Sequence, residues 1–226
     1  MNETYTSPLE APNYGRIARV YRWLEYAAFG GALQRSRETF IDRLHSARSI
    51  AVFGGGDGRC FEAILRECPE AKVDAFDIDP VMIAFARRRA DAVAPGRVSF
   101  HQADARTRVL PAGHYDAVVT QYFLDCFPSD QLQRLIPSIE NSLKSGALWL
   151  FADFAIPPPG APAILRWRAQ ITIAILCWFF RWQVKHPLHN LPPMEEMLLA
   201  QGWAPLATRE RSGRMVRTVL FQKTAT

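Results

Sequence analysis

The chain has 226 residues, enough for one domain with a substantial core, and no linker-like stretch divides it. Its composition, 49% hydrophobic and 22% charged, excludes global disorder. The net charge of +5 is a mild excess, so we expect the basic clusters to be solvated surfaces and no nucleic acid to be a partner. Scattered cysteines without a CxxC pair, and a polar start without a leader, predict free thiols and a cytoplasmic protein.

The first two thirds of the chain alternate between helical and strand-like patterns. Apolar residues at helical spacing predict helices at 14–29 and 32–44, and Ser129 is expected to cap a helix that runs to Leu143. A turn through Lys144 to Gly146 is expected before the fifth strand. The five strands that short apolar runs predict are 49–53, 72–76, 97–101, 115–121 and 147–154. This order predicts a parallel sheet with helices on both faces and a ligand site at the carboxyl ends of the strands.

The last third of the chain departs from this alternation. Residues 163–185 form a hydrophobic helical segment, a short helix is expected at 194–201, and alternating patterns at 203–210 and 215–223 predict an antiparallel hairpin. The expected fold class is therefore α/β, a mostly parallel seven-stranded sheet with a C-terminal antiparallel hairpin.

A glycine-rich loop, AVFGGGDGRC, follows the first expected strand. It is not a phosphate-binding P-loop, because Arg59 and Cys60 stand where Gly-Lys is required. Arg59 also replaces the third glycine of a dinucleotide fingerprint. A GxGxG pattern remains, Gly54, Gly56 and Gly58, in which the backbone comes close to a ligand that has no pyrophosphate.

An acidic residue, Asp77, ends the second expected strand and can accept hydrogen bonds from both hydroxyls of a ribose. A nucleoside with a short amino-acid-like arm fits the loop and this carboxylate. Four segments within about residues 48–154 resemble, in order, four motifs of class I S-adenosylmethionine-dependent methyltransferases. These segments are SIAVFGGGDGRC, VDAFDIDPVMIAFARRRA, HQADARTRVL and GHYDAVVTQYFLDCF. The resemblance implies a Rossmann-like methyltransferase fold, with S-adenosylmethionine as the cofactor.

The resemblance also implies roles for single residues. The three loop glycines would line the methionine arm of the cofactor, Asp77 would hold its ribose, and Ile78 would pack on its adenine. Asp104 would accept the adenine amino group, beside the backbone amide of Ala105. The plainer alternative is that Asp77 and Asp104 only cap helices.

Gln121, which ends the fourth strand, would lie beside the transferable methyl group. The family often carries an acid two residues before the first glycine, where this chain has Val52, so the cofactor's ammonium needs another partner. Backbone carbonyls near Gly54, or Asp57, are the expected substitutes. The related spermidine-synthase-like aminopropyltransferases carry an aspartate at the position of Gln121, and a neutral amide does not deprotonate an alkylammonium.

One domain of four parts is expected: a helical cap at 1–45, a cofactor-binding core at 46–154, a hydrophobic substrate-side insertion at 155–193, and a C-terminal helix and hairpin at 194–226. Weak candidates for a catalytic base are His186, His189, Tyr122 and Asp125. No metal is expected, because no carboxylate neighbours the two histidines.

The segment 171–180 bears on the acceptor of the methyl group. It is too short to span a bilayer, and it could be a buried helix or a dimer contact. Arginines and tryptophans around it, however, are typical of helices that lie at a membrane interface, so 163–185 is a candidate for peripheral membrane contact. YGRIARVYRWLEYAAFGG loosely resembles the start of ubiquinone and menaquinone C-methyltransferases, which implies that Tyr14 and Tyr21 face the cofactor.

The expected function is methyl transfer to a small, lipophilic or aromatic acceptor. The alternatives are aminopropyl transfer and a binding module that has lost turnover. The acceptor atom and the oligomeric state do not follow from the residues.

Overall fold

The structure, a computed structural model, describes residues 29–184 and 191–223, with the backbone alone for 176–184. The strands are β1 Ser49–Phe53, β2 Lys72–Asp77, β3 Val98–Gln102, β4 Tyr115–Gln121, β5 Leu143–Phe154, β6 Trp203–Arg211 and β7 Val216–Lys223. The helices are α2 Ala32–Glu38, α3 Arg59–Glu67, α4 Pro80–Val93, α5 Ser129–Asn141, α6 Ala163–Val184 and α7 Met194–Ala200, with short 3-10 helices η1 Ile41–Leu44 and η2 Leu124–Cys126.

The strands form one seven-stranded sheet in the order β3-β2-β1-β4-β5-β7-β6. Strands β1 to β5 are parallel to one another, while β7 runs antiparallel to both β5 and β6. The predicted fold class, a mostly parallel sheet with a C-terminal antiparallel hairpin, is confirmed. The strand order reverses between β1 and β4, which places the switch point for ligand binding at their carboxyl ends.

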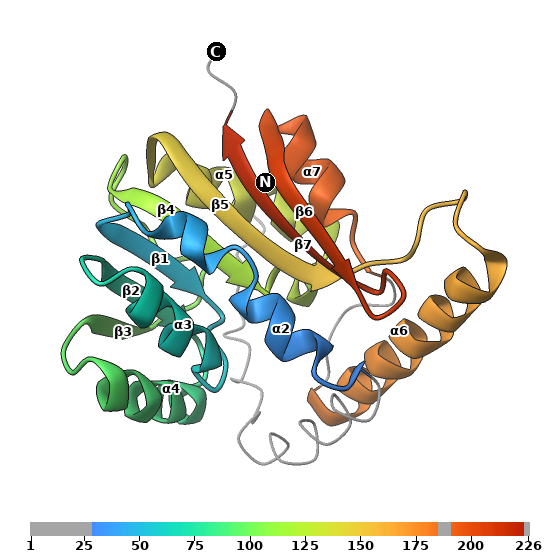
Figure 1. Ribbon diagram of the computed structural model, residues 1–226, viewed down its shortest axis with the longest axis horizontal. Coiled ribbons are helices and arrows are strands. Elements are labelled where there is room, and N and C mark those ends of the chain that lie inside the picture. Colours follow the sequence, from blue (N-terminus) through green and yellow to red (C-terminus); the bar gives the residue numbers. More distant parts are fainter. Residues whose placement is uncertain (1–28, 185–190, 224–226) are drawn as a thin grey trace, which may run out of the picture.

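Each face of the sheet carries its own hydrophobic core. In β1, Ile50 and Val52 pack under α3, α4 and η1, whereas Ala51 and Phe53 pack toward α5 and α7. All four of these side chains are buried, which explains why the sequence of the strand is a continuous apolar run and does not alternate between apolar and polar residues. Figure 1 shows α3 and α4 on the near side of the sheet and α5 and α7 behind it.

Three predicted boundaries are wrong. The helix expected at 32–44 is divided into α2 and η1, because Phe40 adopts a left-handed conformation with φ of 65°. The expected turn through Lys144 to Gly146 lies inside β5, where the register against β4 shifts and Gly146 takes a positive φ. Ser129 is the first helical residue of α5 and not its cap, since Pro128 occupies the cap position.

A third apolar cluster joins α2 and α6 to the carboxyl ends of the sheet. Ala169 and Ile173 of α6 pack with Leu33 of α2, Phe154 at the end of β5 and Val216 at the start of β7. Both helices therefore lie on the side of the molecule where the parallel strands end (Figure 1). Among the helices of the described residues, none is long and apolar enough to cross a membrane.

Candidate functional site

The glycine loop between β1 and α3 is held against β2 by a hydrogen bond from the Gly54 amide to the Phe76 carbonyl, 3.0 Å long. Gly54, Gly56 and Gly58 all have positive φ. A Cβ atom added at Gly54 would lie 2.5 Å from the Phe123 ring, and one at Gly58 would lie 2.5 Å from the Cα atom of Ala86. At Gly56 it would meet nothing within 4 Å, so Gly56 alone of the three faces open space.

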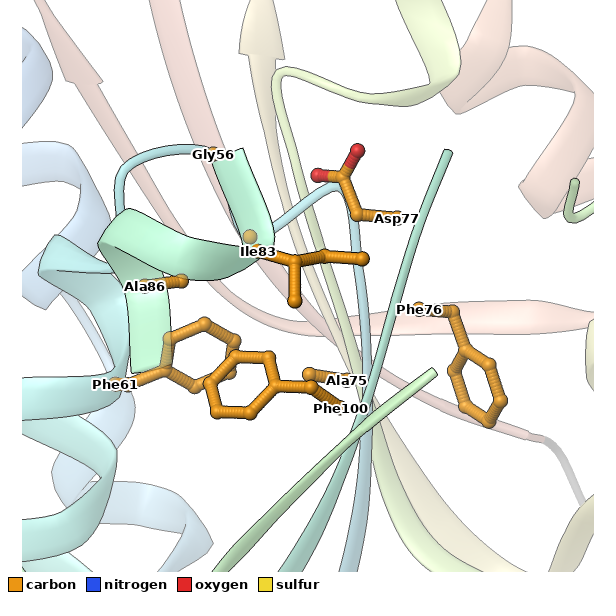
Figure 2. A pocket seen from close by; sticks show the side chains of 9 residues that line it. Gly56, Phe61, Ala75, Phe76, Asp77, Ile83, Ala86 and Phe100 are labelled. Carbon is orange, nitrogen blue, oxygen red and sulfur yellow. The ribbon is translucent and has the colours of Figure 1, made fainter. Parts of the chain in front are cut away.

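A small pocket beside this loop contains the carboxyl group of Asp77. Figure 2 shows Asp77 and Gly56 at one end of the pocket and the rings of Phe61 and Phe100 at the other. Burial raises the pKa of Asp77 to about 6, although hydrogen bonds from backbone amides act in the opposite direction and lower it. One of these comes from the Asp79 amide, 2.9 Å from Oδ1.

Among the side chains of residues 29–175 and 191–223, no arginine or lysine forms an ion pair with Asp77. The helix cap of α4 is supplied instead by Asp79, whose Oδ1 accepts from the amides of Val81 and Met82. Asp77 is therefore a partly buried acceptor that pairs with no cation of the described side chains and does not cap α4.

The carboxyl group of Asp104, after β3, has a different environment. It is clasped by Arg106, whose Nε lies 3.0 Å from Oδ1 and whose Nη2 lies 2.5 Å from Oδ2, and it also accepts from the Arg106 amide. These hydrogen bonds hold the pKa of Asp104 below its usual range. The neighbouring Ala105 packs against the core on the α5 side, and Ile78 accepts a long hydrogen bond from Gln102.

Gln121 lies directly beside the glycine loop, because Phe53 pairs with Thr120 in the parallel register of β1 and β4. Its side chain is buried, and Nε2 donates to the backbone carbonyl of Arg37 at 2.9 Å. A carbonyl accepts only, so this bond fixes the amide orientation. The other amide atom, Oε1, is buried and has no hydrogen-bond partner among the described residues.

Asp57 has no such free acceptor. Its carboxylate pairs with Arg59 at 2.9 Å and with Arg89 at 3.6 Å. Both arginines belong to the helices α3 and α4, so this ion-pair group ties the loop to the helical layer rather than to the open space at Gly56.

Tyr122, one residue beyond β4, is fixed by α2. Its hydroxyl donates to Ser36, whose own hydroxyl donates to the Leu33 carbonyl. The Arg37 guanidinium lies over the Tyr122 ring, 4.7 Å from its centroid. The centroid of the Phe154 ring, at the end of β5, lies 5.1 Å from that of Tyr122. With its proton engaged, Tyr122 serves to position α2 better than it serves as a base.

A pair of carboxyl groups, Asp125 and Asp153, joins η2 to the end of β5. The Asp125 amide donates to Asp153 Oδ2 at 3.3 Å, and the two side chains also lie within hydrogen-bonding reach of each other. Burial raises the pKa of Asp125 to about 6, and burial together with the Asp125 charge raises that of Asp153 well above its ordinary value. Asp153 is 1% exposed, whereas Asp125 is partly exposed.

Asp153 is the residue that sequence reasoning missed. It lies near the carboxyl end of an expected parallel strand, which is the position where site residues gather, and that rule would have found it.

The predicted site residues His186, His189, Tyr14 and Tyr21 lie outside the described residues. His101, in the edge strand β3, stacks on Phe76 and bonds Asp74 at 2.8 Å. Across the described part of the chain, no group of His, Cys, Asp and Glu side chains could hold a metal ion.

Known proteins share this arrangement of strands and glycine loop. Residues 50–146 match the family described as a methyltransferase domain. The ubiquinone/menaquinone biosynthesis C-methyltransferase UbiE of Methylobacterium nodulans is 27% identical over 154 residues, which are 66% of this chain and 60% of that protein. A spermidine synthase of Coffea arabica is 26% identical over 111 residues, 46% of this chain and 35% of that protein.

The matched segment spans less than two thirds of each of these relatives. Among solved structures, the N-methyltransferase NodS of Bradyrhizobium japonicum WM9, in complex with S-adenosyl-L-homocysteine, superposes with a TM-score of 0.64 at 15% identity. The superposition covers 92% of this chain and 98% of NodS. Residues 50–146 thus match a methyltransferase domain, and the strand order and the likeness to NodS show a Rossmann-like methyltransferase fold.

Proposed function

We propose that the protein is an S-adenosylmethionine-dependent methyltransferase that acts on a small, lipophilic or aromatic acceptor. The observation that carries the proposal is the open space at Gly56 beside two acceptors: the Asp77 carboxylate, which pairs with no cation among the described side chains, and Gln121 Oε1, which has no hydrogen-bond partner there. The bound cofactor would supply a methyl group on a sulfonium, which is activated for in-line displacement.

The polar groups of the cofactor fit these acceptors one by one. Asp77 would accept from the two ribose hydroxyls, and Gln121 Oε1 would accept from the ammonium, in the role that an acid fills where this chain has Val52. Since Asp57 is taken by two arginines, Gln121 is the better candidate of the two. Ile78, Asp104 and Ala105 would hold the adenine, as the resemblance implies.

The acceptor would lose its proton to Asp125. A partly exposed carboxyl group with a pKa of about 6 is largely ionised at neutral pH and is a stronger base than an ordinary aspartate. Asp153, buried beneath it, would hold the shared proton and orient Asp125. Methyl transfer then breaks the sulfur–methyl bond and forms the acceptor–methyl bond.

The apolar surroundings support a lipophilic acceptor. The cluster beyond the strand ends combines Phe29, Phe154, Ile173 and Met215, with Tyr122 and Leu191 at its border. Such a lining excludes water from the displacement, which favours loss of the positive charge at sulfur.

Aminopropyl transfer remains the rival within this fold, supported by the shorter match to a spermidine synthase. The two reactions need different cofactors: the methyl donor carries a carboxylate on its amino-acid arm, and the aminopropyl donor has lost it. Tighter binding of decarboxylated S-adenosylmethionine than of the intact cofactor would therefore overturn the methyltransferase proposal.

Isothermal titration calorimetry tests the proposal directly. We expect S-adenosylhomocysteine to bind the wild type, and Gln121→Leu to weaken it about tenfold, the value of roughly one hydrogen bond to a charged group. Binding of methylthioadenosine, which lacks the amino-acid end, should be unchanged in the same variant. No binding of S-adenosylmethionine at high micromolar concentration would contradict the proposal.

Gln222→Leu is the matched control, because the Gln222 amide also donates to a main-chain carbonyl, that of Gly146, at the other end of the sheet. It should bind both ligands like the wild type.

A further inference from the structure

One face of α6 is an exposed apolar stripe. Ile164, Trp167, Ile171 and Ile175 are 65%, 61%, 40% and 59% exposed, and they follow one another at the three- and four-residue spacing of a single helix face. Four large apolar side chains on one surface line are more than the scattered exposure that needs no explanation. We propose that this α6 stripe docks the protein on the surface of an anionic lipid membrane.

The charge around the stripe matches such a surface. Residues 154–194 contain no aspartate or glutamate, but they include Arg166, Arg168, Arg181 and Lys185. Arg168 is exposed on the same side of the helix as the stripe, one residue after Trp167. A helix with apolar and aromatic residues on one face and only basic charges nearby binds the boundary between lipid headgroups and acyl chains.

The opposite face of α6 shows that the helix can lie flat on a surface without leaving the domain. Ala169 is fully buried and Ile173 nearly so, and both pack in the apolar cluster with α2 and the ends of β5 and β7. Gly213, in the turn between β6 and β7, also approaches Leu165 of the same helix. The helix is thus fixed by one face and exposes the other.

A second copy of the chain fits the stripe less well. A symmetric contact would bring two acid-free, basic segments together, and no carboxylate of the segment would offset the repulsion. A lipid surface supplies the missing negative charge from outside.

Docking through α6 deepens the proposed function. The apolar cluster on the buried face of α6 borders Tyr122 and the strand ends, so a lipophilic acceptor would pass from the bilayer to the site along one helix. The membrane contact itself does not depend on catalysis, and the two are tested separately.

The test is flotation of the protein with vesicles of phosphatidylcholine, with and without phosphatidylglycerol. We expect flotation with the anionic vesicles only, reduced at high salt because the attraction is screened. Trp167→Glu with Ile171→Glu should lower the bound fraction at least about tenfold, since two large side chains no longer enter the lipid. Arg168→Gln should lower it about fivefold.

Leu199→Glu is the control: Leu199 is 44% exposed on another helix, α7, and its substitution should leave flotation unchanged. Each variant is also titrated with S-adenosylhomocysteine. Unchanged ligand binding in the stripe variant shows that the fold is intact. Loss of flotation is then caused by the change in the α6 stripe.

Two outcomes would overturn the membrane proposal. One is wild-type protein that stays with the buffer whatever the vesicles contain. The other is a wild-type dimer in sedimentation equilibrium that Trp167→Glu converts to a monomer while vesicles bind neither form, since the stripe would then be covered by a second copy.

Discussion

Two carboxyl groups near adjacent strand ends, Asp77 as the last residue of β2 and Asp104 two residues after β3, have pKa shifts of opposite sign. Burial without a cation raises the pKa of Asp77 to about 6, whereas Arg106 holds that of Asp104 below its ordinary range. Asp104 is satisfied by its own neighbour two residues away, and Asp77 is not satisfied by any cation of the described chain. Of these two aspartates, the one without a paired cation is the better candidate for binding a neutral hydroxyl donor.

The largest expected effect separates the two residues by ligand affinity. Asp77→Asn should weaken S-adenosylhomocysteine binding about 100-fold, because two hydrogen bonds to a charged acceptor become bonds to a neutral one. Asp104→Asn should weaken it no more than about tenfold, since Arg106 already occupies much of that carboxylate. Calorimetry on both variants measures this, and equal losses would end the distinction.

A smaller effect is expected from pH. Below about pH 6 Asp77 becomes protonated and loses acceptor strength, so the affinity for S-adenosylhomocysteine should fall about tenfold between about pH 7.5 and about pH 5. Asp104 should not contribute, because its pKa lies below this window. The dependence should persist in Asp104→Asn and disappear in Asp77→Asn; a slope that survives in the latter would assign the titration to another group.

The smallest effect is on stability and has opposite signs at the two positions. The folded-state pKa of Asp77 lies above its ordinary value of 3.8, so its contribution to stability is present below about that pH and is lost as the pH rises through about 6. Asp77→Asn should therefore raise the free energy of unfolding at neutral pH by about 1 kcal/mol. Arg106→Ala should lower it by about 1 kcal/mol.

Urea unfolding of the unliganded variants at neutral pH and at about pH 4 checks these signs. The gain from Asp77→Asn should vanish at the lower pH, where the wild-type carboxyl group is already protonated in the fold. A variant that is less stable than the wild type at neutral pH would show that Asp77 is structural.

Local patterns were enough to predict most of the fold. The central strands β1 and β4 are buried on both faces, so apolar runs such as Ser49–Phe53 identify them. The break at Phe40 was not predictable, because a left-handed phenylalanine carries no local signal of the kind that glycine or asparagine gives. The extension of β5 to Leu143 arises from pairing with Tyr115, a contact between distant segments.

In the candidate site, too, some residues could be predicted from local sequence and others depend on contacts between distant segments. Asp77 and the loop glycines are recognisable from spacing alone. The engagement of Asp57 by Arg59 and Arg89, and that of Gln121 by Arg37, depend on how helices pack on the sheet. Asp153 could be found from its position near the end of a strand. Its partner Asp125 lies in η2, after a different strand, and no sequence pattern indicates that the two residues are in contact.

The attachment of α2 has a consequence for the order of folding. Its two polar links to the sheet, from Gln121 to the Arg37 carbonyl and from Tyr122 to Ser36, join residues 84 and 86 positions apart. Such contacts close only after the strands between them have assembled, so we expect α2 to dock late in folding and its amides to exchange with solvent before those of β1 and β4. Opening of this one helix would uncover Gln121 while the sheet stays intact, at a cost far below that of global unfolding.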